Sequence, residues 1–223
     1  MNARTRIVNR IVTLWPKTLE LFGIRRQTVL AALAAIMTLG LPLSGCDRAP
    51  PPPEPDAIDV SSEAYANDFT LTDHRGKTTR LSDFRGKIVA LFFGFTQCPD
   101  VCPTTLITFS EVYRNLGPDA DQVQVLFVSV DPERDTQQLL AEYIPAFNPK
   151  FTGLRGTPEE IRRVADMYKV SYQKIPTSGG KSYTIDHTAY VFLFDRAGHL
   201  RFKVPHGQPA AALTALIREM ENN

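Results

Sequence analysis

Two continuous apolar runs stand out in the hydrophobic pattern of the chain. Residues 87–95 read KIVALFFGF and residues 122–131 read QVQVLFVSVD, and both are rich in β-branched and aromatic side chains. Runs of this kind are typical of strands that other elements cover on both faces of a sheet. The pattern therefore predicts two central strands, with a helix from Pro103 to about Leu116 between them.

Shorter segments around this pair alternate between strand and helix patterns. The further predicted elements are a β-hairpin over 68–81, amphipathic helices over 135–147 and 157–170, a second hairpin over 188–205 and a closing helix over 209–222. Alternation of strands and helices predicts an α/β three-layer sandwich with a mixed sheet. The order fits a thioredoxin-like fold with an N-terminal β-hairpin extension.

Charge divides the chain near residue 46. The whole chain has 25 basic and 24 acidic side chains, of which residues 1–46 hold six basic and one acidic, so residues 47–223 carry 19 and 23, a net charge of −4. A mildly acidic domain has no basic footprint for nucleic acid, and that class of partner is set aside.

The basic N-terminal segment contains a long uncharged run. Arg25 and Arg26 precede residues 27–45, which carry no charge and lead into the sequence LSGC, ending at Cys46. This order is typical of an export signal. The LSGC sequence resembles a bacterial lipobox, whose cysteine is lipidated and becomes the new N-terminus. An uncleaved transmembrane anchor is the alternative, although the run is shorter than a usual span of about 20 residues.

These features predict three regions. We expect residues 1–46 to be an export signal ending at a lipidated Cys46, residues 47–64 to be a Pro-rich periplasmic tether, and residues 65–223 to be the folded domain. Proline favours extended polyproline II conformation in such a tether. Asp47 resembles an inner-membrane retention signal, so the expected location is the periplasmic face of the inner membrane in a bacterial cell envelope, with a lipid anchor.

The other two of the three cysteines follow the first central strand in the sequence CPDVC. Cys98 and Cys102 lie where this strand passes into a helix, and amides at a helix start lower the pKa of a thiol. Their spacing allows a reversible disulfide and also a two-thiolate clamp for a soft ion such as Cu(I). A zinc site would show a further Cys or His at short spacing. A static structural disulfide closing so short a loop adds little stability.

One of the four histidines is placed differently from the others. His187 lies just before the predicted strand at 188–195, and in a thioredoxin-like topology this strand start lies beside the helix that carries the cysteines. His74, His199 and His206 occupy turn-like contexts, where we expect solvated or capping roles. We therefore predict His187 as the third metal ligand, with a hydrogen-bonded histidine at a strand end as the alternative.

Four segments together resemble the Sco family, including its SenC and PrrC-like members. They are residues 93–106, 128–136, 151–170 and 185–202, and the resemblance covers roughly residues 65–221. It implies a membrane-tethered, thioredoxin-like protein in which Cys98, Cys102 and His187 bind one copper ion as Cu(I) or Cu(II). It also implies a role at the CuA site in subunit II of cytochrome c oxidase. Other periplasmic copper chaperones or thioredoxin-like reductants are the further expected partners.

Two acids near these residues are candidates for metal handling or partner contact. Asp131 ends the second central strand and should lie at the sheet edge near the site, with a helix N-cap as the alternative role. Asp186 precedes His187 and would orient its imidazole as a hydrogen-bond acceptor only if the strand has not yet begun, because adjacent strand residues point to opposite faces. We expect residues 173–187 to form the flexible loop that delivers His187.

Three functions remain in competition. A copper metallochaperone is a binding protein rather than an enzyme and uses all three ligands. A thiol–disulfide reductase acting on CuA-site cysteines is an enzyme and uses only the pair. A peroxiredoxin is the third, because CPTT at 102–105 resembles the context of a peroxidatic cysteine; Cys102 would then be the nucleophile and Cys98 its resolving partner, and His187 would have no role.

Overall fold

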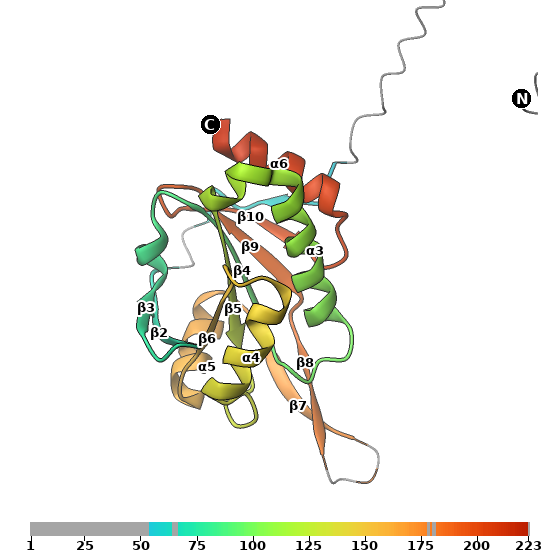
Figure 1. The fold of residues 1–223 in the computed structure, drawn as a ribbon. Helices are drawn as coiled ribbons and strands as arrows, with labels where there is room; N and C mark the ends of the chain where they lie inside the picture. Colours follow the sequence, from blue (N-terminus) through green and yellow to red (C-terminus); the bar gives the residue numbers. More distant parts are fainter. Residues whose placement is uncertain (1–53, 64–66, 178, 180–181, 223) are drawn as a thin grey trace, which may run out of the picture. The chain divides into compact units, whose positions relative to one another are not determined.

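An eight-stranded mixed sheet forms the centre of the computed structural model (Figure 1). The strand order is β1-β10-β9-β4-β5-β6-β2-β3. The strands are β1 (Ile58–Asp59), β2 (Thr70–Asp73), β3 (Thr78–Arg80), β4 (Ile88–Gly94), β5 (Val123–Ser129), β6 (Thr152–Arg155), β9 (Tyr190–Phe194) and β10 (Leu200–Pro205). The helices are α3 (Val101–Leu116), α4 (Gln137–Phe147), α5 (Pro158–Met167) and α6 (Ala210–Asn222), with 3-10 turns η2 (Leu81–Phe84) and η3 (Gly117–Gln122).

The structure describes residues 54–63, 67–177, 179 and 182–222, all within a compact unit that extends from residue 51 to the C-terminus. The predicted export signal and Cys46 lie outside the described residues. Among the residues that are described, no helix combines the length and the apolar character that crossing a membrane requires.

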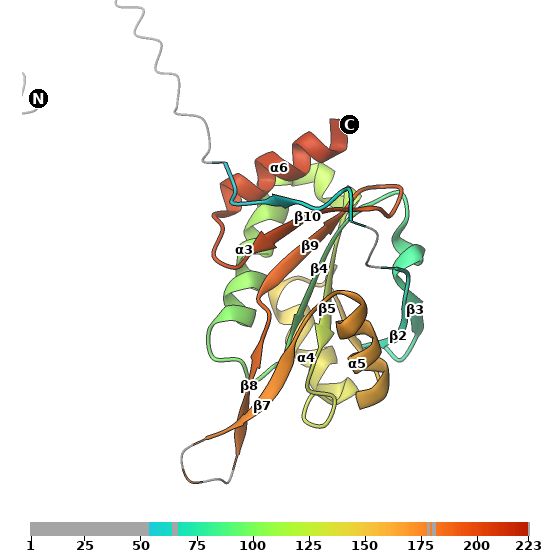
Figure 2. The same cartoon turned by 180° about the vertical axis from the view of Figure 1, so that it is seen from behind.

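The two predicted central strands are confirmed as β4 and β5. They pair in parallel from Ile88 opposite Val123 to Gly94 opposite Ser129, and each of their residues is buried. Alternate side chains therefore enter two separate cores. Helices α3, α4 and α6 cover one face of the sheet, and α5 covers the other, as the front view and the view from behind show (Figures 1 and 2). This arrangement confirms the thioredoxin-like three-layer fold.

Strand direction decides which loops meet. Because β4 and β5 are parallel, the segments that follow Gly94 and Ser129 leave the sheet at the same end, beyond the carboxyl ends of the two strands. β9 is antiparallel to β4, so the chain enters β9 at this same end of the sheet. The loop with the cysteines, the loop with Asp131 and the segment that ends in His187 are therefore brought to one end of the sheet by strand pairing alone.

The segment expected to be a flexible loop is instead a second sheet. β7 (Tyr172–Pro176) and β8 (Tyr183–His187) form an antiparallel hairpin in which Tyr172 pairs with His187. The hairpin extends beyond the end of the main sheet in both views (Figures 1 and 2). β7 is exposed on both faces from Gln173 to Pro176 and lacks the alternation of apolar and polar positions that predicts a strand, whereas β8 buries Ile185 between exposed neighbours.

Two further strands, β1 and β6, went unpredicted. β1 lies inside the range expected to be tether, yet it pairs with β10, and the neighbouring Val60 is only 1% exposed. β6 has four residues and joins β5 in parallel on one side and β2 on the other. The folded part of the chain thus includes residues before 65.

His74 was expected to be solvated, and this expectation is wrong. Its side chain is 4% exposed, and its Nδ1 accepts a hydrogen bond from the backbone N–H of Gly153 at 3.1 Å. The backbone N–H of His74 in turn donates to the carbonyl of Gly153 at 2.8 Å. Burial lowers the pKa of the imidazole, which stays neutral and links the N-terminal hairpin to β6.

Candidate metal centre

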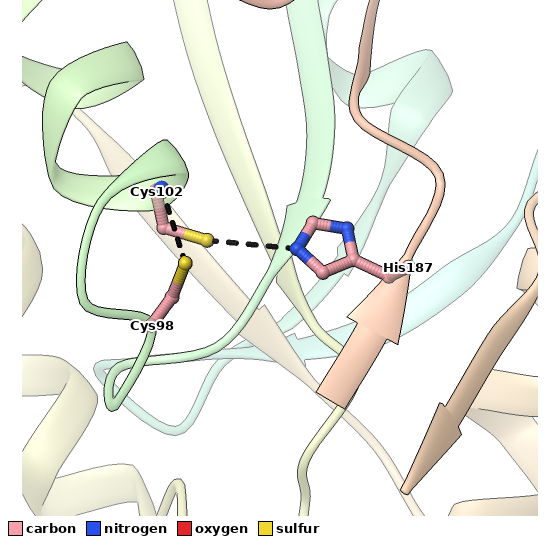
Figure 3. Close-up of side chains that lie close together, drawn as sticks. All are labelled: Cys98, Cys102 and His187. Carbon is pink, nitrogen blue, oxygen red and sulfur yellow. Dashed lines mark hydrogen bonds between the residues drawn. The ribbon is translucent and has the colours of Figure 1, made fainter. Parts of the chain in front are cut away.

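Three side chains from separate segments converge at the end of the sheet where β4 and β5 finish. The sulfur atoms of Cys98 and Cys102 and a ring nitrogen of His187 all lie within 4.8 Å of one another. Cys98 comes from the loop after β4, Cys102 from the first turn of α3, and His187 from the end of β8, and the three point toward a common centre (Figure 3). The Sγ atom of Cys102 lies 3.9 Å from Nε2 of His187.

The start of α3 positions the two sulfurs. The helix begins at Val101, two residues earlier than predicted, so Cys102 lies in its first turn, where Pro103 is tolerated because that N–H has no helical partner. The backbone N–H of Cys102 donates to Sγ of Cys98 at 3.5 Å. The N–H of Cys98 donates to the carbonyl of Phe95 at 3.2 Å, which folds the loop back on the strand.

The two cysteines differ in protonation. The hydrogen bond that Cys98 receives from the Cys102 side chain, with further help from His187 and from backbone N–H groups, lowers the pKa of the half-buried Cys98 to about 3. The same pairing and burial raise the pKa of Cys102, which is only 1% exposed. At neutral pH the pair therefore consists of one reachable thiolate and one buried thiol.

The imidazole of His187 is oriented by the backbone. Its Nδ1 lies 3.1 Å from the carbonyl oxygen of Thr188, which only accepts hydrogen bonds, so Nδ1 donates to this oxygen and Nε2 faces the sulfurs. The ring of Phe95 packs against the imidazole edge-on, at 6.0 Å between centroids. Asp186 does not take the predicted orienting position, because β8 continues through His187 and leaves Asp186 exposed.

Asp131 is fully buried and connects the loop after β5 to the hairpin. Its carboxylate accepts a hydrogen bond from the hydroxyl of Tyr183 at 2.8 Å and forms an ion pair with Arg134. The guanidinium of Arg134 lies 3.7 Å from the centre of the Tyr183 ring and donates to the Tyr183 carbonyl at 2.7 Å. It also donates to the side chain of Gln97, next to Cys98, at 3.1 Å. Asp131 and Arg134 thus hold the start of β8, at Tyr183, against the cysteine loop.

Asp135 is a second buried acid at the site, and sequence reasoning missed it. Its carboxylate accepts hydrogen bonds from the hydroxyl groups of Thr96 and Ser129, both at 2.6 Å, and from the N–H of Thr96 at 3.1 Å. Burial raises its pKa, opposed by these hydrogen bonds. Asp135 therefore fixes the loop two residues before Cys98. The repeated acid in the sequence VDPERD was the available signal.

Gly94 provides the space for the buried sulfur. A Cβ atom at this position would lie 2.6 Å from Sγ of Cys102 and 2.8 Å from the ring of Phe127. Neither neighbour has room to move, because both side chains are buried. The last residue of β4 must therefore be glycine for Cys102 to reach the centre.

Two sulfurs and one imidazole nitrogen, held this way, are a donor set that suits copper.

We expect Tyr183→Phe to loosen His187 without removing any ligand. The variant loses the hydrogen bond to Asp131 and keeps the aromatic ring, so Cu(II) affinity should fall by about tenfold. Amide hydrogen exchange in β7 and β8 should become faster. Tyr172→Phe, on the neighbouring strand of the same hairpin, is the matched control and should leave both measurements as in the wild type. Unchanged exchange in Tyr183→Phe would refute the clamp.

The chain resembles known proteins over nearly all of the described region. The family model SCO1/SenC matches residues 59–222. Among curated proteins, the mitochondrial SCO2 homologue of Bos taurus is 39% identical over 153 residues, which are 68% of this chain and 58% of that protein. The chain thus spans somewhat more than half the length of this relative.

Solved structures agree with this assignment. The copper-bound ScoI of Bradyrhizobium japonicum matches with a TM-score of 0.65 and 42% identity, over 70% of this chain and 99% of that one. The copper-bound ScoI of Arabidopsis thaliana matches with a TM-score of 0.66 and 34% identity, over 72% and 100%. The predicted family is thereby confirmed: the chain belongs to the SCO1/SenC family.

Proposed function

We propose that this protein is a copper metallochaperone that holds one copper ion through Cys98, Cys102 and His187 and assists assembly of the CuA site of cytochrome c oxidase. The observation that carries the proposal is the convergence of three ligand atoms from three separate segments within 4.8 Å. The copper-bound structures of related proteins support it. Subunit II of the oxidase is the proposed acceptor, as the family resemblance implies.

The geometry suits an ion that enters and leaves. Two thiolates are sufficient for Cu(I), and the imidazole completes a three-ligand set that also holds Cu(II). Cys98 is the more exposed of the two cysteines, so an acceptor's own ligands would approach from its side. Oxidation of the pair to a disulfide removes two electrons and the two thiolate ligands together, and this step switches copper binding off.

Replacement of His187 by Ala tests the ligand assignment. The reduced full chain should take up one copper ion, and Cu(II) should give thiolate-to-copper charge-transfer absorption. His187→Ala should lower Cu(II) affinity by about a hundredfold and change this absorption, while Cu(I) binding by the two thiolates is better preserved. His199→Ala is the control, because this side chain is 77% exposed. An unchanged Cu(II) titration and spectrum in His187→Ala would exclude His187 as a ligand.

The difference between the cysteines also favours a second function, thiol–disulfide reduction of CuA-site cysteines. The Cys98 thiolate would attack the partner's disulfide, forming a mixed disulfide and releasing one partner thiolate. Cys102 would then lose its proton and attack Sγ of Cys98, releasing the second thiolate. A peroxiredoxin, by contrast, needs Cys102 as the reactive thiolate, and its burial and raised pKa argue against that function.

Selective alkylation checks the assignment of nucleophile and resolving thiol. At about pH 6 the iodoacetamide reaction of the reduced protein should label Cys98 and leave Cys102 unlabelled, because only the Cys98 pKa lies below this pH. Peptide mass spectrometry locates the label. Preferential labelling of Cys102 would reverse the two roles. A dithiol reduction potential too high to reduce CuA cysteines would exclude the reductase function.

We propose further that a lipid on Cys46 tethers the domain to the periplasmic face of the inner membrane. The export-signal pattern, the lipobox-like LSGC sequence and Asp47 support this location.

Fractionation of bacterial cells checks the anchor. The wild-type protein should sediment with inner membranes and gain the mass of a lipid on Cys46, whereas Cys46→Ser should lose the lipid. Cleavage before residue 46 is part of the same expectation, because lipidated cysteines become N-terminal. A protein that keeps residues 1–45 and remains in the membrane fraction without any lipid would show an uncleaved transmembrane anchor instead.

A further inference from the structure

His206 makes two contacts that its turn-like sequence context did not indicate. Its backbone N–H donates to the carbonyl of Ala189 at 3.0 Å. Its imidazole Nδ1 lies 3.2 Å from Oγ1 of Thr105, in α3. Ala189 follows His187 by two residues, and Thr105 lies about one turn beyond Cys102 in the same helix. His206 therefore joins the segment after one proposed ligand to the helix that carries another.

The direction of the bond between His206 and Thr105 follows from a single hydrogen atom. The hydroxyl of Thr105 donates to the carbonyl of Val101 at 2.8 Å. A threonine hydroxyl has only one hydrogen to give, so Oγ1 can only accept from the imidazole. Nδ1 of His206 is therefore the donor. Thr105 is 8% exposed, so both bonds lie where water competes little for them.

The carbonyl that Thr105 holds belongs to the peptide group beside the metal centre. The C=O of Val101 and the N–H of Cys102 are parts of one planar peptide group, so fixing one of them fixes the direction of the other. That N–H donates to Sγ of Cys98 at 3.5 Å. Hydrogen bonds thus run from the imidazole of His206 through Thr105 and this peptide group to a sulfur, and bonds in such a chain polarise one another.

The main sheet holds His206 in place. It directly follows β10, whose last residue, Pro205, pairs with Tyr190, the first residue of β9. His187, Thr105 and His206 line one small cavity. The imidazole is thus presented from a paired strand end, beside the two segments that it connects.

We propose that His206 is a positioning residue of the metal centre. Through Thr105 it orients the N–H group that is donated to Cys98. It also sets the spacing between the start of α3, with Cys102, and the segment that delivers His187. The proposal deepens the proposed function and rests on it in taking the two cysteines and His187 as copper ligands.

Copper titration of full-chain variants tests this role. His206→Ala should lower Cu(II) affinity by about tenfold, as is typical when a residue that orients a metal ligand is lost, and should change the sulfur-to-Cu(II) absorption. Thr105→Val loses both hydrogen bonds and should have a larger effect. His206→Asn should restore the wild-type affinity and absorption, because its amide nitrogen takes nearly the position of Nδ1 and can donate to Thr105.

NMR of the reduced, metal-free full chain tests the hydrogen bonds themselves. Nδ1 of His206 should carry a proton in the long-range proton–nitrogen correlation spectrum. The amide proton resonance of Cys102 should move upfield in His206→Ala and further in Thr105→Val, because a weaker hydrogen bond to sulfur deshields this proton less. His206→Asn should return the resonance to its wild-type position.

Thr214→Val is the matched control. The hydroxyl of Thr214, in α6, donates to the carbonyl of Ala210 at 2.7 Å and accepts a hydrogen bond from the side chain of Asn115 at 3.4 Å. This buried threonine has the same pair of contacts as Thr105, at the other end of α3 from the cysteines. The variant should lower the melting temperature as Thr105→Val does and leave the copper absorption and the Cys102 resonance unchanged.

The proposal is overturned if His206→Ala leaves the Cu(II) affinity and the Cys102 resonance at their wild-type values, or if Thr214→Val moves them equally. It is also overturned if His206→Asn restores neither quantity, or if Nδ1 of His206 carries no proton. Failure of the wild type to bind copper would instead reject the metallochaperone function, because the NMR measurements are made without metal.

Discussion

The position of every ligand depends on how β4 pairs with its two neighbours. Its parallel register with β5 brings the cysteine loop and the loop with Asp131 and Asp135 to one end of the sheet. Because β9 is antiparallel to β4, the chain enters β9 from that same end of the sheet, and His187 lies just before this entry. β4 and β5 are buried on both faces, so a slip of one residue in register would move each side chain from one core into the other. The buried centre of the sheet thus fixes the site.

A rigid sheet alone does not hold a histidine that arrives on an exposed hairpin. The hairpin buries Ile185 in the core, and polar contacts fasten it as well: Asp131 accepts a hydrogen bond from the hydroxyl of Tyr183, and Arg134 stacks on the same ring. Arg134 also reaches Gln97 beside Cys98, so one side chain contacts both halves of the centre. A hairpin held by a few polar contacts opens more easily than a packed strand. This difference suits a protein that must release the ion it binds.

Electrostatics distinguish the two sulfurs although they belong to one short motif. A half-buried thiolate at Cys98 and a buried thiol at Cys102 arise because one sulfur receives hydrogen bonds and the other, in the first turn of α3, points into the core. The same pair thereby supports metal binding and disulfide exchange. Asp135, a buried acid nearby, acts through its hydrogen bonds to Thr96 in the cysteine loop.

The sequence by itself determined the central strands, the order of helices, the cysteine pair and His187. Continuous apolar runs mark buried strands whatever surrounds them, and cysteine and histidine carry the metal chemistry in their own side chains. Only the tertiary structure decided how these residues are oriented. β7 is exposed on both faces and shows no pattern of its own, so its pairing with β8 and the exposed side of Asp186 were hidden. The roles of Asp135 and Arg134 depend on contacts between residues far apart in the chain, because burial and pairing set what an acid or a guanidinium does.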